Sequence, residues 1–309
     1  MSFLPGSGVK LTNVALVTEK PGRIWLIDVA TGRKTPVSGA PRVVVSSQGG
    51  LLDIVAAPTF AGDQMVYLTY SEPSAAGGSG LALARAKLAD IATSPRLEGF
   101  TMLWHDPAGG AGGQFGARIA FAPDGQSLFL SSGERQRFTP AQDLSQPLGK
   151  ILHLTLDGKP APGNPFAGKT GAASVKITDP PADSDEARIA RGRTFTWPGV
   201  NLTPAETWSS GHRNPYGLAF APDGRLWEHD ALIAGAFILV GAGIDALRNV
   251  RGLRVQIVLE AESRPMETGL LVTDALHRIA CCLFDFLGDT RRPIALTVHG
   301  PGRAGYRGR

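Results

Sequence analysis

Four short polar segments, each containing or flanked by glycine, hold the side chains best suited to bind a ligand. They are residues 46–54, 112–119, 133–135 and 208–215. Polar residues in glycine-bordered connections are typical of binding sites, because connecting loops can meet at one end of a rigid scaffold. The alternative is that each segment is a linking turn with satisfied side chains. For any one segment alone, that alternative is favoured.

The elements that must position these segments are short antiparallel strands. Residues 121–125 and 220–224 share the sequence Phe-Ala-Pro-Asp-Gly, and an apolar run follows each copy. Proline presets φ, aspartate bonds back to the backbone and glycine supplies a positive φ, so the pattern predicts strand, tight turn, strand. Weaker versions occur at residues 3–6 and 57–58. Four hairpins of one design predict a repeat architecture, and a β-propeller is the natural candidate because each blade is a small antiparallel sheet.

Composition agrees with an all-β fold and excludes several classes of function. Glycine and proline together make up 62 of the 309 residues (39 and 23), which favours many turns and short strands over long helices. The net charge of +4 is spread along the chain without a Lys/Arg cluster, so nucleic-acid binding is not expected. The two cysteines, Cys281 and Cys282, are adjacent, so they define no disulfide framework. No signal peptide is visible, because neither a basic n-region nor an apolar h-region follows Met1. The uncharged run over residues 231–244 is too short to span a bilayer comfortably.

The composition changes abruptly near residue 230. All five tryptophans and all eight lysines precede this point, whereas both cysteines follow it. We therefore expect two parts, a turn-rich part over residues 1–229 and an unrelated tail over residues 230–309.

In their order and residue types, the motifs of the first part resemble those of the pyrroloquinoline-quinone (PQQ)-dependent soluble aldose sugar dehydrogenases, the glucose/sorbosone dehydrogenase family. The matching stretches are residues 19–24, 48–53, 115–118, 163–166 and 211–215. The resemblance covers residues 1 to about 229. It implies a six-bladed β-propeller that holds PQQ and Ca²⁺ at its mouth. It also implies hydride transfer from the anomeric C1 of an aldose to the quinone, which gives a lactone, with an external electron acceptor and a periplasmic location.

The resemblance also implies roles for particular residues. Arg213 would stack on the quinone and pair with its carboxylates, which suits a planar guanidinium. Asn214 would donate to the quinone oxygens, and Gln48 would lie near the reactive carbonyl and the sugar. The alternative for Arg213 is a structural ion pair between blades.

The chain departs from the family pattern at three points. Gln114 occupies the position of the family's catalytic histidine, and a neutral amide cannot act as a general base, although it can hydrogen-bond a sugar hydroxyl. His105 is a possible substitute base that nothing in the sequence favours. The calcium-binding segment expected after His229 is absent, as are later blades, so no metal ligand is assigned. The chain also enters the first blade without its opening strand. We therefore expect an incomplete propeller.

The tail weakly resembles the opening βαβ unit of an FAD-dependent monooxygenase. An apolar run over residues 231–240 precedes Gly241, Gly243 and Ala246, and Glu260 lies 19 residues after Gly241. This spacing approximates a dinucleotide-binding fingerprint, which would make the tail a short α/β segment. The alternatives are frameshifted or otherwise unselected sequence and a degraded Rossmann fragment.

Three functions follow from these observations. The first is PQQ-dependent oxidation of aldose sugars through Gln48, Arg213 and Asn214. The second is a non-catalytic remnant, either a carbohydrate-binding partial propeller or a chain that does not fold stably, because missing blades leave open sheet edges. The third is flavin or NAD binding through the tail. The sequence does not identify the sugar, the electron acceptor or the oligomeric state.

Overall fold

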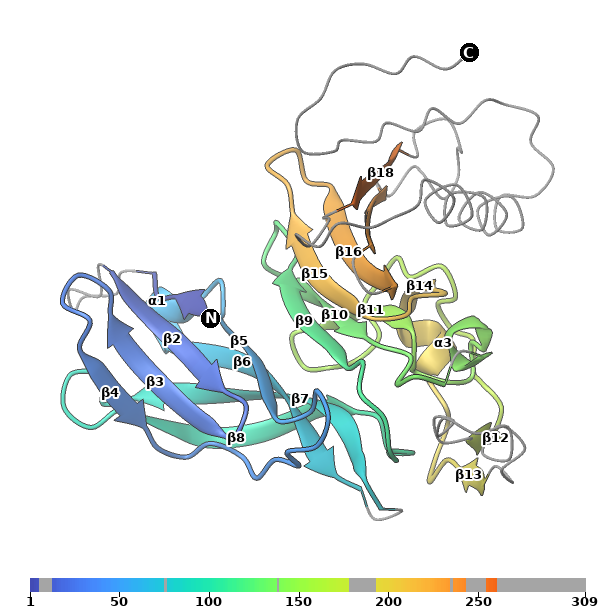
Figure 1. Ribbon diagram of the computed structural model, residues 1–309, viewed down its shortest axis with the longest axis horizontal. Coiled ribbons are helices and arrows are strands. Elements are labelled where there is room, and N and C mark those ends of the chain that lie inside the picture. The colour runs from blue at the N-terminus through green and yellow to red at the C-terminus, as the bar shows by residue number, and fades with distance from the viewer. Residues whose placement is uncertain are drawn as a thin grey trace, which may run out of the picture.

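The computed structural model describes residues 1–5, 13–74, 77–137, 139–177, 193–233, 236–242 and 254–259. Within these residues the chain forms four four-stranded sheets in which every pairing is antiparallel. The sheets follow one another along the chain as an incomplete propeller (Figure 1). No helix among them is long and apolar enough to cross a bilayer.

Each of the first two sheets runs through its strands in sequence order. The first sheet contains β1 (Ser2–Phe3), β2 (Val14–Glu19), β3 (Arg23–Asp28) and β4 (Lys34–Val37). The second contains β5 (Leu51–Ala56), β6 (Met65–Pro73), β7 (Ser79–Ala89) and β8 (Arg96–His105), with the single-turn α1 (Phe60–Asp63) between β5 and β6.

The third and fourth sheets repeat this plan. The third contains β9 (Gly116–Phe121), β10 (Ser127–Ser132), β11 (Lys150–Thr155) and β14 (Thr207–Ser210). The long connection before β14 carries η1 (Thr139–Gln142), the two-stranded pair β12 (Ser174–Ile177) and β13 (Arg193–Thr196), and α3 (Thr203–Glu206). The fourth contains β15 (Pro215–Phe220), β16 (Leu226–Ile233), β17 (Ala236–Ala242) and β18 (Arg254–Leu259).

The repeated Phe-Ala-Pro-Asp-Gly segments form the same turn, as predicted. In the β9–β10 hairpin, Gly125 has φ 69° and donates its N–H to Ala122 O at 2.8 Å. In the β15–β16 hairpin, Gly224 has φ 81° and donates to Ala221 O at 2.9 Å. Of the two weaker motifs, residues 57–58 lie between the paired strands β5 and β6, and the described residues 3–5 lie at the end of β1, which pairs with β2.

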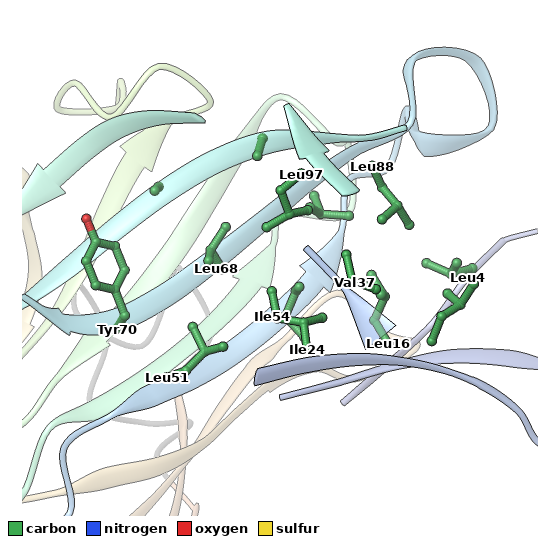
Figure 2. Packing of buried hydrophobic residues seen from close by; sticks show 14 of the residues in the cluster. Leu4, Leu16, Ile24, Val37, Leu51, Ile54, Leu68, Tyr70, Leu88 and Leu97 are labelled. Carbon is green, nitrogen blue, oxygen red and sulfur yellow. The ribbon is translucent and has the colours of Figure 1, made fainter. Parts of the chain in front are cut away.

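Neighbouring sheets are held together by shared apolar layers. Figure 2 shows the layer between the first two sheets, to which Leu16 and Ile24 contribute from one side and Ile54 and Leu68 from the other. Strand β10 then alternates its faces, as strand geometry requires. Leu128 and Leu130 join the layer toward the second sheet, and Phe129 joins the layer toward the fourth. The first strands of the sheets lie side by side in chain order, with contacts from β1 and β2 to β5, from β5 to β9 and from β9 to β15.

Within the described residues, the strands of the tail pair differently from those of the predicted βαβ unit. The apolar run over residues 231–240 doubles back, so that Ala231 lies opposite Phe237 in an antiparallel ladder. β17 and β18 also pair antiparallel, with Ile238 opposite Ile257, whereas a βαβ unit pairs its strands in parallel. Gly241, where a helix was expected to open, instead belongs to β17. Gly241 pairs with Trp227 of β16 and with Arg254 of β18, so its backbone groups belong to the sheet.

The remaining tail predictions fall elsewhere in the chain. Gly243, Ala246 and Glu260, together with Cys281 and Cys282, lie outside the described residues. The compositional boundary at residue 230 falls within β16, which continues to Ile233.

Candidate functional site

Three of the four predicted site residues meet where the connections before β5, β9 and β15 come together. The backbone N–H of Gln114 donates to Gln48 Oε1 at 2.7 Å. The hydroxyl of Tyr216, in β15, donates to the same oxygen. The N–H of Gly116 donates to Asn214 Oδ1 at 3.2 Å. These bonds connect residues 66 to 168 positions apart in the sequence. We call this region the mouth, defined by Gln48, Gln114, Gln136, Arg213 and Asn214.

The backbone fixes the orientation of the carboxamides at the mouth. Gln136 N–H donates to Gln114 Oε1 at 3.2 Å, and Gly113 N–H donates to Gln136 Oε1 at 2.9 Å. A backbone N–H can only donate, so the atom it contacts must be the amide oxygen. Within the described residues, the NH₂ groups of Gln48, Gln114, Gln136 and Asn214 donate no hydrogen bond. The mouth therefore holds four carboxamides whose acceptors are engaged and whose donors are available.

Arg213, which directly precedes Asn214 in the chain, adds a positive charge to the mouth. Its Nε lies 4.0 Å from Oε1 of Glu134, whose side chain is almost completely buried, while about a third of the Arg213 side chain (36%) is exposed. The backbone of the two residues is also joined, because Glu134 N–H donates to Arg213 O at 2.8 Å. The structural ion pair considered as an alternative is thus present. It also holds the guanidinium in place while leaving part of it accessible.

Arg135 and Arg137 support the loop that carries Gln114. The guanidinium of Arg135 lies 3.8 Å above the ring of Phe115 and donates to carbonyls that include Gly110 O, Gly112 O and Gly113 O. Arg137 donates to Gly109 O and Ala111 O at 3.0 Å each. These buried cations take the place of regular secondary structure in satisfying the carbonyls of the loop. Arg135 was predicted within a candidate ligand-binding segment, and in the structure it stabilises the segment that presents Gln114.

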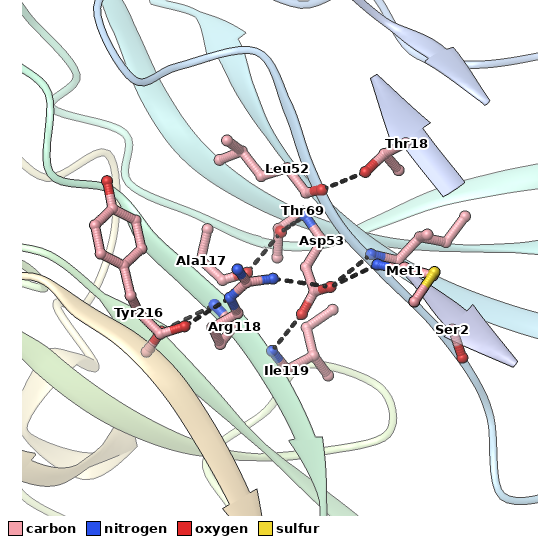
Figure 3. Close-up of polar contacts among 12 residues, drawn as sticks. Met1, Ser2, Thr18, Leu52, Asp53, Thr69, Ala117, Arg118, Ile119 and Tyr216 are labelled. Carbon is pink, nitrogen blue, oxygen red and sulfur yellow. Dashed lines mark hydrogen bonds and ion pairs between the residues drawn. The ribbon is translucent and has the colours of Figure 1, made fainter. Parts of the chain in front are cut away.

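Asp53 and Arg118 join three sheets (Figure 3). The buried carboxylate of Asp53 lies 3.5 Å from Arg118 Nη1 and accepts the N–H of Ile119 at 3.3 Å. Arg118 Nε donates to Tyr216 O at 2.7 Å. The N-terminal amino group lies 3.9 Å from the same carboxylate. Asp53 is the last residue of the sequence motif 48–53, and Arg118 is the last residue of the motif 115–118. Their contacts join the first strands of the second, third and fourth sheets.

Among the residues that define the mouth, none offers a general base in place of the family's histidine, because four are carboxamides and the Arg213 guanidinium stays protonated. Gln114 is buried and has a positive φ of 52°. His105, the possible substitute, is instead engaged through Nδ1 by Glu72. This hydrogen bond raises the pKa of His105, which favours the protonated form that cannot accept a proton.

Sequence reasoning missed a second group of polar residues directly behind Arg213 and Asn214. Asp230 accepts the backbone N–H groups of both residues, at 2.7 and 2.6 Å. Its neighbour on the same face of β16, Glu228, is buried, and burial raises the pKa of this carboxyl. His212 Nδ1 lies 3.5 Å from Glu228 Oε2. The polarity of residues 228–230 is visible in the sequence, but the sequence does not show that Asp230 contacts the backbone of residues 213 and 214.

The chain matches the model of the family described as Glucose / Sorbosone dehydrogenase over residues 2–177 and 184–233. It is 32% identical over 231 residues to "Aldose sugar dehydrogenase YliI" of Escherichia coli (strain K12), covering 74% of this chain and 52% of that protein. It is 28% identical over 244 residues to "Uncharacterized protein slr1608" of Synechocystis sp., covering 72% and 48%. The chain thus spans about half the length of the curated relatives it matches.

Solved structures of glucose and aldose sugar dehydrogenases are also similar to this chain. A glucose dehydrogenase crystal structure shares 33% identity and a TM-score of 0.60, over 77% of this chain and 59% of that chain. The PQQ-bound aldose sugar dehydrogenase of Streptomyces coelicolor shares 28% identity and a TM-score of 0.57, over 78% and 58%.

Proposed function

Because the chain belongs to the glucose/sorbosone dehydrogenase family, we propose that its mouth binds PQQ and that it oxidises aldose sugars to lactones. The observation that carries this proposal is the set of oriented carboxamide donors at the mouth, which also contains Arg213. Four carboxamides present NH₂ groups there because backbone N–H groups engage their oxygens. A ligand rich in acceptors and negative charge complements such a mouth.

The residues present fit PQQ, a planar quinone with several carboxylates. Arg213, about one third exposed, offers a flat cation for stacking and for pairing with a carboxylate. Asn214 and Gln48 would donate to oxygens of the cofactor and of the sugar. When bound, the quinone supplies the oxidant that takes the hydride from C1 of the sugar. The protein's own contribution is to position both molecules and to exclude acceptors that would compete for its donors.

Gln114 limits the rate in this account. Oxidation at C1 also requires loss of the hydroxyl proton, and a carboxamide has no basic lone pair to accept it. General-base catalysis typically contributes about 10² to 10⁴ in rate. We therefore expect slow turnover, with Gln114 serving to orient a sugar hydroxyl through its available NH₂ group.

The described residues fit calcium less well than they fit PQQ. The resemblance implies backbone carbonyl ligands just after His229. Residues 229–231 instead continue β16, where Asp230 lies opposite Ile238 and Ala231 lies opposite Phe237. Carbonyls committed to an antiparallel ladder are not gathered in a loop around a hard cation.

The direct test is PQQ-dependent reduction of an artificial electron acceptor by the purified chain with glucose. We expect a slow rate that saturates with both PQQ and sugar. An absence of turnover at high protein concentration, with PQQ bound, would reject the catalytic part of the proposal.

Gln114 favours a second candidate function, carbohydrate binding without catalysis. Its amide suits a sugar hydroxyl and lacks a base, so a chain with this residue could retain sugar affinity while losing chemistry. Saturable sugar binding by calorimetry, without acceptor reduction, would identify this function. Turnover would reject it.

A further inference from the structure

Behind Arg213 and Asn214, three side chains form a compact group of potential metal ligands. His212 comes from the connection between β14 and β15, and Glu228 and Asp230 lie two residues apart on one face of β16. His212 Nδ1 lies 3.5 Å from Glu228 Oε2 and 3.8 Å from Asp230 Oδ2. One ligand atom of each residue lies within 4.8 Å of the other two.

Two of these side chains are held in place by bonds outside the group. Nε2 of His212 lies 2.7 Å from Ser209 Oγ, which leaves Nδ1 directed at the carboxylates. Such a contact to the second imidazole nitrogen is the usual way in which a metal-binding histidine is oriented. The two oxygens of Asp230 are fixed by the backbone N–H groups of Asn214 and Arg213.

The third side chain, Glu228, has an unsatisfied carboxylate. The residue is only 5% exposed, and among the described residues neither of its carboxylate oxygens has a hydrogen-bond partner. The imidazole of His212 approaches at 3.5 Å without forming a hydrogen bond. Burying an ionised carboxylate in this way is unfavourable unless a cation or a proton compensates it. Within the described part of the chain, the carboxylate is thus a buried group without a hydrogen-bond partner, close to His212 and Asp230.

The separations suit a small cation with mixed nitrogen and oxygen ligands. Bonds of about 2.0–2.2 Å in a tetrahedral arrangement place ligand atoms about 3.4 Å apart. The separations of 3.5 and 3.8 Å from His212 Nδ1 are close to this value. Imidazole suits Zn²⁺ and related transition metals, whereas Ca²⁺ requires six to eight oxygen ligands.

We propose that His212, Glu228 and Asp230 bind one divalent transition-metal ion of the Zn²⁺ type, with water in the fourth position. The ion would neutralise the Glu228 carboxylate. It would also rigidify the segment carrying Arg213 and Asn214, because Asp230 holds the backbone of both residues. The site uses side chains only, so it is distinct from carbonyl ligation of calcium.

The test is calorimetric titration of the full chain with Zn²⁺ alone, without PQQ or sugar. We expect one ion per chain. The variant S209A removes a supporting contact and should weaken Zn²⁺ binding about 10- to 100-fold. The variants H212Q and E228Q each remove a ligand and should weaken binding by more than S209A does. The control is H105Q, because His105 pairs with one carboxylate, Glu72, outside this group.

Absence of stoichiometric binding would overturn the proposal, as would unchanged affinity in H212Q or an equal loss in H105Q. If the ligand variants do not fold by circular dichroism, Co²⁺ titration of the unmodified chain decides. Intense visible absorption indicates four-coordinate Co²⁺ and supports the site. A weak spectrum like that of the hydrated ion contradicts it.

Discussion

At the scale of single residues, hydrogen bonds from the backbone determine what the mouth can recognise. Gln48 and Asn214 each accept an N–H from the strand-entry segment at residues 114–116. Their oxygens are consequently engaged, and their NH₂ groups remain available as donors. We therefore expect an acceptor-rich molecule as the occupant of the proposed site.

Restoring a base at position 114 should increase turnover. Gln114→His should raise the rate of PQQ- and glucose-dependent acceptor reduction by about 10²- to 10⁴-fold, because an imidazole can take the C1 hydroxyl proton. Histidine tolerates the left-handed backbone, φ 52°, better than most residues. The measurement is the initial rate at saturating PQQ, with Gln126→His, in the exposed β9–β10 turn, as the control. An unchanged rate in a variant that still binds PQQ would contradict this role.

Lys150 should make stability depend on pH. Burial lowers its pKa from 10.5 to about 7, against the opposing effect of Asp143. Between these values the unfolded chain holds a proton that the folded chain has lost, so the free energy of unfolding rises with pH. Relative to Lys150→Met, the unmodified chain should gain about 2 kcal/mol between pH 7 and 9.

Urea unfolding at several pH values measures this difference, and Lys159→Met, at an exposed position, controls for removal of one positive charge. A constant difference between the chain and Lys150→Met across this range would refute the assignment.

At the scale of elements, the two repeated turns depend on glycine. Gly125 and Gly224 have φ values of 69° and 81°. Alanine at either position should lower the free energy of unfolding by about 1–2 kcal/mol, the cost of a left-handed L-residue. A Cβ at Gly224 would meet nothing within 4 Å, so Gly224→Ala measures the free-energy cost of the left-handed backbone alone. At Gly125 a Cβ would also approach Pro58 Cβ at 3.3 Å.

Gly62, in α1, is the matched control for these substitutions. A Cβ there also meets open space, and its φ is not positive. Gly62→Ala should be neutral or stabilising. Equal stability of Gly224→Ala and the unmodified chain in urea would show that these turns do not require glycine.

The hairpins were predictable because their signal is local. Five residues contain the proline, aspartate and glycine that define each turn, and no distant contact is needed. The mouth was predictable only as a set of candidates. The bond from Gln114 to Gln48 spans 66 residues, and the bond from Tyr216 spans 168. Asp230 was not predicted as a site residue because it lies at the change in composition, within β16. β16 pairs antiparallel with β17, and the hydrophobic pattern alone did not distinguish this pairing from a strand followed by a helix.

At the scale of the whole molecule, one buried carboxylate and its arginine link three of the sheets in addition to the apolar layers. Asp53 connects the second sheet to Arg118 in the third, and Arg118 contacts Tyr216 O in the fourth. Asp53→Asn should destabilise the chain by about 1.5–3 kcal/mol, because a buried charge-assisted contact is lost. Thermal unfolding measures this, with Asp223→Asn in an exposed turn as the control. Similar midpoints for both variants would show that Asp53 does not hold the sheets.

The most direct test of the central claim is titration of the purified chain with PQQ, followed by quinone absorbance. We predict saturable binding that Arg213→Ala weakens at least about tenfold, since a charge-assisted pair is lost. Arg225→Ala, which removes an exposed arginine paired with Asp223, should leave binding unchanged. Absence of saturation, or equal affinity in Arg213→Ala, would contradict the account of the mouth as a PQQ site.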